Sequence, residues 1–362
     1  MTTEHVTPQL ELDYKPKLGA KTDYGIGIIG TGWVANNYHL PAYRKAGFSV
    51  VAITDINKEK VEATGRHWGI EKVFTDYHQL LELDEVQIVD IATPTFGRLE
   101  IVENAAAAGK HMLVQKPLAR QYADALAMVE AAEKAGVKLG VNSHYRWLPN
   151  YRAAYNLLQQ GLIGEPFLII DEMHGNQDFV YYYQMPERRW NAELDDFMFV
   201  EWGAHHFDFV RFWAGKEPLT VYCVGTRKPG QIFKSEMVCL YVLRFPEPLR
   251  ACLILDQVSP PWDFGMRFRI EGTEGVVEGW DYLHLRCYAN KIGDEWAEWR
   301  LDVEEPLWSD SYIGTMGDLM NAITEGREHI SSGRDNLNTV RAYLAGMLSA
   351  KEGRPVRPEE IR

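Results

Sequence analysis

A glycine-rich turn able to bind phosphate lies near the N-terminus, at Gly30-Thr31-Gly32-Trp33-Val34-Ala35. It follows the apolar run Gly25–Ile29 and precedes a stretch of helical composition. Gly30 permits a tight bend, Gly32 lets the main chain approach a pyrophosphate, and Ala35 allows a helix to pack closely on a strand. The N-terminus of that helix favours the phosphate charge. We therefore expect this turn to bind a dinucleotide; the alternative is a glycine turn that binds no ligand.

Asp55 follows the next apolar run, where an acidic residue that binds the adenosine ribose is expected. Its carboxylate would repel the 2′-phosphate of NADP, because like charges disfavour each other at short range. The following residues, Ile56 and Asn57, supply no guanidinium to hold such a phosphate. The predicted cofactor is therefore NAD.

A second group of residues whose side chains could take part in catalysis is Glu201, His205 and Asp208. Their spacing places them on one face if the segment is helical throughout. With the neighbouring His206, these oxygen and nitrogen atoms offer one alternative, a divalent metal site. A second alternative is a helix start that only orients its loop. Hydride transfer to NAD needs no Lewis acid where a lysine can stabilise charge, so we expect no metal.

The elements that must position these residues change in kind along the chain. From Tyr24 onward, nearly continuous apolar runs alternate with helical stretches, the pattern of a doubly wound parallel α/β sheet. The predicted strands are 25–29, 48–54, 86–92, 111–114 and 137–141, and the predicted helices are 58–68, 99–108 and 121–135. Lys116 follows the fourth strand, and the carboxyl ends of such strands face the ligand crevice.

After about Arg146 the strand-like runs follow one another across short turns, which favours an antiparallel sheet. The predicted strands are 221–225, 237–245, 250–257, 267–272 and 283–288, with helices at 150–160, 203–214, 311–325 and 336–350. A chain of 362 residues also suits two domains. We expect an N-terminal tail or arm at 1–22, a cofactor domain at 23–145, and a substrate and oligomerisation domain at 146–362. The last helix of that domain is free to pack back on the first.

Composition narrows the class of protein. The chain carries 38 Lys and Arg against 51 Asp and Glu, a net charge of −13, which disfavours binding to nucleic acid. The N-terminal 23 residues are polar, unlike a signal peptide, and no apolar run approaches the ~18 residues that span a bilayer. No Cys-x-x-Cys pair occurs among Cys223, Cys239, Cys252 and Cys287. These cysteines are typical of small core residues in a reducing compartment, and we expect a cytoplasmic protein.

Several short motifs resemble the Gfo/Idh/MocA oxidoreductase family, over about residues 24–356. Those of the first half are Thr75-Asp76-Tyr77, Leu80-Leu81, Ala92-Thr93-Pro94, Ala108-Gly109-Lys110-His111 and Gln115-Lys116-Pro117-Leu118-Ala119. Those of the second half are Gly161-x-Ile163-Gly164, Glu271-Gly272-Thr273-Glu274-Gly275 and Ser349-Ala350. The resemblance implies a Rossmann domain, then an α/β domain with an open, mostly antiparallel sheet. It also implies hydride transfer between nicotinamide and a hydroxyl-bearing carbon, usually of a sugar, cyclitol or polyol.

The resemblance also assigns three catalytic residues, Lys116, Glu201 and His205. The family's lysine, in a Glu-Lys-Pro motif, corresponds to Lys116, and its Asp-x-Gly-x-His-x-x-Asp motif resembles residues 201–208. His205 then takes the hydroxyl proton, for which imidazole has a suitable pKa range, while Lys116 stabilises the developing oxyanion. Thr93, Pro94, Gln115 and Lys116 join the glycine turn and Asp55 as expected cofactor contacts.

Three positions depart from the family pattern. Gln115 stands where the family usually has glutamate, and Glu201 stands where it usually has aspartate. Glu201 keeps a carboxylate but moves it outward by one methylene. Arg98 occupies a position where histidine is common, and the sequence does not reveal its role.

Aromatic and arginine side chains suggest a substrate pocket, since flat rings pack against the apolar faces of sugar rings. Tyr145 and Arg146 directly follow a predicted strand and are expected to face the crevice, with Trp190 as a further contact. The substrate contacts are therefore expected to be Lys116, Tyr145, Arg146, Trp190, Glu201 and His205. Other candidates are Trp147, Tyr181, Tyr182, Tyr183, Arg188, Arg189 and Trp202. The alternative for each aromatic is a place in the core or at a subunit interface.

The leading function is an NAD-dependent sugar or polyol dehydrogenase. One alternative is a glycoside-cleaving enzyme that retains NAD and passes through a transient keto-sugar. Another is a non-catalytic sugar sensor on the same fold. The resemblance further implies that the open sheet pairs with that of another subunit, as a homodimer or homotetramer.

Overall fold

The computed structural model describes residues 10–260, 265–293, 295–303 and 308–362. By their contacts these residues fall into two compact units. The N-terminal unit consists of Lys15–Trp147 and the described part of 304–340. The C-terminal unit consists of the described part of 1–14 with Leu148–Val303 and Arg341–Ile361. Residues 308–340, which the sequence analysis groups with the second domain, thus cluster with the first sheet.

The N-terminal unit is built on a six-stranded parallel sheet in the order β3-β2-β1-β4-β5-β6. The strands are β1 (Gly25–Ile29), β2 (Ser49–Thr54), β3 (Lys72–Phe74), β4 (Ile88–Ile91), β5 (His111–Gln115) and β6 (Leu139–Asn142). Every residue of β1, β4 and β6 is buried, as expected for a sheet covered on both faces. The strand order reverses between β1 and β4, and dinucleotides bind beside such a reversal, at the carboxyl ends of the strands.

The helices of this unit are α1 (Leu40–Ala46), α2 (Lys58–Trp68), α3 (Tyr77–Leu81), α4 (Arg98–Ala107), α5 (Tyr122–Ala135) and α9 (Ser309–Glu325), with a π-helical turn η1 (Ala35–His39) and a 3-10 turn η2 (His144–Trp147). Local signals fix several ends. The Asn57 side chain accepts a hydrogen bond from the Lys60 amide at the start of α2. Gly47, Gly69 and Gly136 end α1, α2 and α5 in the left-handed conformation.

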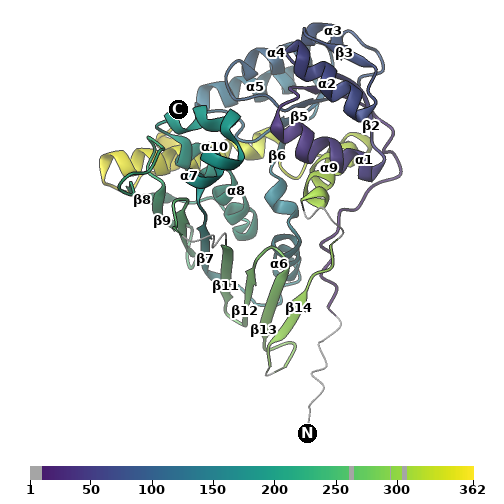
Figure 1. The fold of residues 1–362 in the computed structure, drawn as a ribbon. Coiled ribbons are helices and arrows are strands. Elements are labelled where there is room, and N and C mark those ends of the chain that lie inside the picture. Colours follow the sequence, from purple (N-terminus) through teal and green to yellow (C-terminus); the bar gives the residue numbers. More distant parts are fainter. Residues whose placement is uncertain (1–9, 261–264, 294, 304–307) are drawn as a thin grey trace. The chain divides into compact units, whose positions relative to one another are not determined.

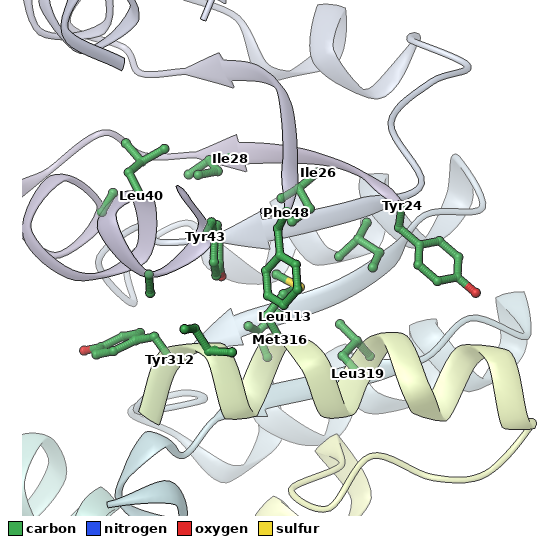
Figure 2. Close-up of a cluster of buried hydrophobic side chains, with 14 of the residues drawn as sticks. Tyr24, Ile26, Ile28, Leu40, Tyr43, Phe48, Leu113, Tyr312, Met316 and Leu319 are labelled. Atoms are coloured by element: carbon green, nitrogen blue, oxygen red, sulfur yellow. The ribbon is translucent and has the colours of Figure 1, made fainter. Parts of the chain in front are cut away.

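The core between α9 and the first sheet joins segments that are far apart in the sequence (Figure 2). Met316 and Leu319 rise from α9 toward the sheet, where Ile26, Phe48 and Leu113 lie in the same buried cluster. Burying each such side chain stabilises the fold by roughly 1.5–3 kcal/mol. Helix α9 is therefore an integral layer of the N-terminal unit.

The C-terminal unit is built on an eight-stranded sheet in the order β14-β13-β12-β11-β7-β10-β9-β8. The strands are β7 (Pro166–His174), β8 (Thr220–Thr226), β9 (Val238–Arg244), β10 (Arg250–Asp256), β11 (Gly265–Gly272), β12 (Gly275–Trp280), β13 (His284–Ala289) and β14 (Ala297–Arg300). Only the β7–β10 pair is parallel among these neighbours. The predicted Rossmann sheet and mostly antiparallel second sheet are confirmed (Figure 1).

One face of this second sheet is covered and the other is open. The helices of the unit are α6 (Pro149–Gln159), α7 (Gln177–Phe179), α8 (Gly203–Ala214) and the second part of α10 (Gly333–Glu352), with short π or 3-10 segments at 180–184, 186–193, 198–202 and 358–360. Helices α6 and α8 contact β12 and β7. Burial alternates along β9, and the outward residues Leu240 and Val242 keep about half of their surface exposed.

Four strands of the two sheets were missed by the sequence-based prediction. Strands β3, β7, β12 and β14 were not predicted, because short or charged strands lack the apolar signal. Tyr181, Tyr182 and Tyr183 lie in a π-helical turn. Residues 1–9 of the predicted N-terminal arm lie outside the described residues. Among those described, no helix is long and apolar enough to cross a membrane.

Candidate dinucleotide and catalytic site

The glycine turn has the geometry that a pyrophosphate requires. Gly30 donates its amide to the carbonyl of Thr54 (2.8 Å) and has a φ of +98°, which favours glycine. A Cβ at Gly30 would lie 3.1 Å from the carbonyl carbon of Ala92. At Gly32, in contrast, no described atom lies within 4 Å of the Cβ position. The main chain is thus closely packed on one side of the turn and accessible at Gly32.

Asp55 lies beside this turn, at the end of β2. Its Oδ2 accepts hydrogen bonds from the amide (2.9 Å) and hydroxyl (3.2 Å) of Thr31, and its Oδ1 accepts one from the Asn57 amide (2.9 Å). Ile56, the next residue, is 95% exposed. The carboxylate therefore holds the turn directly, and its charge is at the place where an adenosine ribose would be bound.

Thr93 and Pro94 follow β4 at the same sheet edge. The Thr93 hydroxyl is buried and has no hydrogen-bond partner among the described residues. An unpaired buried hydroxyl is costly unless a ligand or water satisfies it. Pro94 is exposed. This segment is consistent with a contact to a polar group of a bound nucleotide.

Arg98, whose role the sequence did not reveal, connects this segment to the next strand end. It is 1% exposed, and its guanidinium donates to the carbonyl of Gln115 (2.6 Å) and to the carbonyls of Thr93 and Pro117. A planar guanidinium with five N–H groups can serve several carbonyls at once. Arg98 therefore fixes the loops after β4 and β5 with respect to each other.

Gln115 ends β5, and Lys116 directly follows it. The Gln115 Oε1 accepts a hydrogen bond from the Lys116 amide (2.8 Å), and its Nε2 donates to His39 Nε2 (3.1 Å). Gln115 pairs with Asn142 in the register of β5 and β6. Lys116 is half-buried, and the Lys116–Pro117 peptide bond is cis. The lysine predicted to act in catalysis thus lies at the carboxyl edge of the sheet, as expected.

His144, on the 3-10 turn after β6, is near enough to feel the charge of Lys116. Its burial and this positive charge lower the pKa of His144 to about 3. The ring stacks on Tyr312 of α9, with centroids 4.5 Å apart. The imidazole of His144 is therefore neutral at physiological pH and adds no charge close to Lys116.

The two residues that follow His144 were predicted to contact substrate, and both are buried. Tyr145 stacks on Trp308 with ring centroids 5.9 Å apart. Arg146 donates to the carbonyl of Ile330 (2.5 Å) and to the carboxylate of Asp335 (2.6 Å). The guanidinium of Arg146 is therefore bound by the protein itself and joins η2 to the start of α10.

In the C-terminal unit, Glu201 lies on a π-helical turn (Met198–Trp202) and His205 on the first turn of α8. Glu201 is half-buried and His205 is 6% exposed. The adjacent His206 is fully buried, with its Nδ1 2.6 Å from Asp171 Oδ2 and its Nε2 3.0 Å from the sulfur of Met173. His206 thus holds α8 against β7. His205 directly precedes it on the same turn of α8.

The aromatic candidates differ widely in exposure. Burial raises the pKa of Tyr181 to about 12, opposed by the Arg188 charge and assisted by that of Glu201. Tyr182, Tyr183 and Trp190 are exposed, at 47%, 68% and 44%. Trp190 is therefore available to a ligand, whereas Tyr181 belongs to the core with Phe197 and Phe233.

No group of three or more His, Cys, Asp or Glu side chains is placed to hold a metal ion within the described ranges. His206 and Asp171 form a pair with a methionine sulfur, and this set is not one that a hard divalent cation prefers. All four cysteines are free thiols.

The sequence missed His39 and Asn142, which lie beside Gln115, and Asp90, which lies beside His39. Asn142 could have been found, because it ends β6 beside Gln115 at the carboxyl edge. His39 lies on a helical turn and Asp90 within an apolar strand, and neither position carries a local signal.

Comparison with known proteins agrees with this geometry. The family described as "Oxidoreductase family, NAD-binding Rossmann fold" matches residues 24–143, and the GFO/IDH/MocA C-terminal domain matches residues 151–278. A D-apiose dehydrogenase of Paraburkholderia graminis is 30% identical over 340 residues, which cover 91% of this chain and 88% of that protein. The chain belongs to the Gfo/Idh/MocA oxidoreductase family.

Two further relatives of this family cover nearly the whole chain. A myo-inositol 2-dehydrogenase of Thermotoga maritima is 24% identical over 345 residues, 93% of this chain and 99% of that protein. The crystal structure of an Agrobacterium radiobacter oxidoreductase in complex with NAD+, L-tartaric acid and magnesium has a TM-score of 0.84 at 26% identity. It covers 94% of this chain and 100% of that one. The predicted family, its oxidoreductase class and NAD as its cofactor are thus confirmed.

Proposed function

We propose that this Gfo/Idh/MocA protein transfers a hydride between a hydroxyl-bearing carbon of a sugar, cyclitol or polyol and the nicotinamide of NAD. The observation that carries the proposal is Lys116 at the end of β5, where the adjacent Gln115 side chain holds its main chain. The names of the relatives support the substrate class, because one is a D-apiose dehydrogenase and the other a myo-inositol 2-dehydrogenase. The acidic surface, at −13, disfavours a nucleic acid partner.

For the cofactor, we assign the pyrophosphate to the main chain of residues 30–35 and the adenosine ribose to Asp55. Residues at the ends of β4 and β5 then contact the nicotinamide half: Thr93, Pro94, Gln115 and Lys116. Two observations support this assignment. The space around a Cβ position at Gly32 is open, and the buried hydroxyl of Thr93 has no hydrogen-bond partner among the described residues. When bound, the nicotinamide ring accepts or returns the hydride.

For the chemistry, we assign the general base to His205 and the electrostatic partner to Lys116. The imidazole of His205 accepts the hydroxyl proton, which makes the oxygen anionic as the hydride leaves carbon. The ammonium of Lys116 stabilises that negative charge, and Glu201 orients the base or the substrate hydroxyl. Neutral His144 places no competing charge beside Lys116.

For the substrate, we retain Lys116, Glu201, His205 and Trp190 as direct contacts. Trp190 is 44% exposed, so part of its side chain is accessible to a sugar ring. Tyr145 and Arg146 are assigned to the support of the site, since stacking and hydrogen bonds to the protein already occupy them.

The test is a panel of sugars, cyclitols and polyols, incubated with the protein and NAD while NADH absorbance is followed. We expect net NADH formation with at least one member of the panel. Lys116→Met and His205→Asn should each lower kcat by about 10²- to 10⁴-fold. Lys134→Met, which removes an exposed lysine of the same unit, is the matched control and should leave kcat unchanged. Retained turnover in Lys116→Met would contradict the assignment.

The same assay separates the two alternatives. A glycoside-cleaving enzyme with retained NAD would consume glycosides without net NADH formation. A sugar sensor would bind ligand equally well before and after Lys116→Met, with no turnover in either case.

We also propose an assembly and a cellular location. The open face of the second sheet presents adjacent apolar side chains, Val224, Leu240 and Val242, each about half exposed, which favours a homodimer or homotetramer. Free thiols at all four cysteines support a reducing, cytoplasmic compartment.

A further inference from the structure

We propose that His39 is a positioning residue for Gln115 and Lys116, and that it performs this role as the neutral imidazole protonated on Nδ1. Glutamine at position 115 is the partner that this tautomer requires. The inference rests on the proposed function only for the role of Lys116 in catalysis. The proton positions follow from hydrogen bonds within the N-terminal unit.

The first step is the orientation of the Gln115 amide. The main-chain N–H of Lys116 can only donate, and it lies 2.8 Å from one terminal atom of the Gln115 side chain. That atom must therefore be the carbonyl oxygen, Oε1. The NH₂ group then points to His39, with Nε2 of Gln115 3.1 Å from Nε2 of the ring. An NH₂ group donates, so His39 Nε2 must offer a lone pair.

The same lone pair orients a second amide. Asn142 Nδ2 lies 3.3 Å from His39 Nε2, and an amide carbonyl facing that lone pair would be repelled, so Asn142 turns its NH₂ toward the ring. Its Oδ1 then faces the Thr315 hydroxyl at 2.8 Å, a hydroxyl that can donate either to this oxygen or to the Tyr312 carbonyl (3.1 Å). Two donors thus converge on one ring nitrogen. A proton on that nitrogen would face both of them.

The other ring nitrogen faces an acceptor. His39 Nδ1 is 2.6 Å from Asp90 Oδ2, and the Tyr43 hydroxyl donates to the same oxygen (2.7 Å). Burial and the Asp90 carboxylate raise the pKa of Tyr43 well above its usual value, so its hydroxyl stays a donor. The single imidazole proton therefore resides on Nδ1, between the ring and Asp90.

This arrangement connects the ends of three adjacent strands through one ring. Asp90 belongs to β4, Gln115 ends β5 and Asn142 ends β6, while His39 comes from the turn η1. His39, Asp90 and Asn142 are fully buried, so within the described structure no solvent replaces a lost partner. The side chain of Gln115 is thereby fixed at both ends, and with it the main chain of Lys116.

The residue type at position 115 decides whether this ring stays neutral. A glutamate there would present a carboxylate oxygen, in place of the NH₂, to the lone pair of His39. Two facing acceptors repel each other unless the ring takes a second proton. The other titratable groups around His39 are Asp90, Tyr43, Tyr312, His144 and Lys116. The departure of Gln115 from the family's glutamate is thus coupled to the protonation of His39.

One experiment observes the proton directly in the full-length protein. Ring ¹⁵N NMR, with His39→Gln to assign the signal, should show His39 as a neutral ring carrying its proton on Nδ1. The same signal should appear with and without NADH. A proton on Nε2, or on both nitrogens, near neutral pH would overturn the inference.

A second experiment measures the coupling. The Kd for NADH and kcat of Gln115→Glu are divided by the wild-type values at each pH between about 6 and 9. We expect the Kd ratio to increase about tenfold or more across this range, because His39 loses its second proton. Gln79→Glu adds the same charge at an exposed position of the same unit and should give a flat ratio.

The double variant Gln115→Glu with His39→Gln removes the titrating ring. We expect its Kd ratio to be independent of pH. A ratio that is flat in Gln115→Glu, or that stays pH-dependent in the double variant, would refute the coupling. The NMR signal and the Kd for NADH require no substrate, so these two readouts remain valid even if the proposed substrate class fails.

Discussion

The buried guanidinium of Arg98 donates a hydrogen bond of 2.6 Å to the main-chain carbonyl of Gln115. The same group serves the carbonyls of Thr93 and Pro117, so one cation joins the loops after β4 and β5. A histidine, which is common at this position in the family, has two ring nitrogens and a shorter reach. The arginine therefore has a structural role at this position, because it donates to several main-chain carbonyls at once.

Replacing Arg98 should affect stability and catalysis together. Arg98→Met leaves several carbonyls unsatisfied, and we expect the free energy of unfolding to fall by about 2–4 kcal/mol. We also expect kcat to fall, because the main chain next to Lys116 loses its anchor. Urea unfolding and steady-state kinetics measure the two effects. Arg66→Met, at a side chain 73% exposed, is the control and should change neither.

Asp55 should determine the choice between NAD and NADP. Asp55→Asn keeps an oxygen for the Thr31 amide but removes the charge that repels a 2′-phosphate. Adding Ile56→Arg at the neighbouring exposed position supplies a guanidinium for that phosphate. We expect the ratio of kcat/KM for NAD over NADP to fall by about a hundredfold in the double variant. Asp84→Asn, which removes an exposed carboxylate elsewhere, should leave the ratio unchanged; an unchanged ratio in both would refute the role of Asp55.

His144 should make the protein less stable in acid. Its pKa is about 3 in the folded protein, lowered by burial and by Lys116, against a usual value of 6.5. Between these values the unfolded chain binds a proton that the folded one does not. Stability is therefore lost as the pH falls from about 6.5 toward 3, by up to about 1.4 kcal/mol per pH unit.

The test of this dependence is His144→Phe, which keeps an aromatic ring on Tyr312 but cannot titrate. We expect its Tm to decrease less than the wild-type Tm between pH 7 and about pH 4.5. His78→Gln, at an exposed histidine, is the control. Parallel Tm curves for wild type and His144→Phe would show that another group dominates.

The open face of the second sheet should hold the proposed oligomer together. Leu240 and Val242 are 48% and 52% exposed and lie beside Val224 across the β8–β9 pair. Leu240→Glu with Val242→Glu places charges in that apolar face, where an interface would have to desolvate them. We expect the molar mass from light scattering to drop to that of a smaller species. Ile56→Glu, at a side chain 95% exposed in the other unit, should not alter the mass.

Local sequence patterns predicted most helices and strands, and for two helices the predicted bounds equal the observed ones. The predicted helices at 58–68 and 203–214 coincide with α2 and α8. Asn57 caps the start of α2, and Gly69 and Gly215 end α2 and α8 in the left-handed conformation. The strands missed, such as β7 with its acidic residues and the three-residue β3, are held by pairing with neighbours distant in sequence. Periodicity alone carries no information about such pairs.

The sequence by itself determined the glycine turn and its acidic partner, because both belong to one βαβ unit, where spacing along the chain fixes spacing in the fold. It also pointed to Lys116 through its place after an apolar strand. Only the tertiary structure decided the roles of Arg98 and His39. Their partners come from several strand ends, and Thr315, which lies 2.8 Å from Asn142 Oδ1, comes from a helix 173 residues further along the chain. Buried polar groups must be satisfied by whatever lies beside them in space, so their function is defined by the packed structure rather than by local sequence.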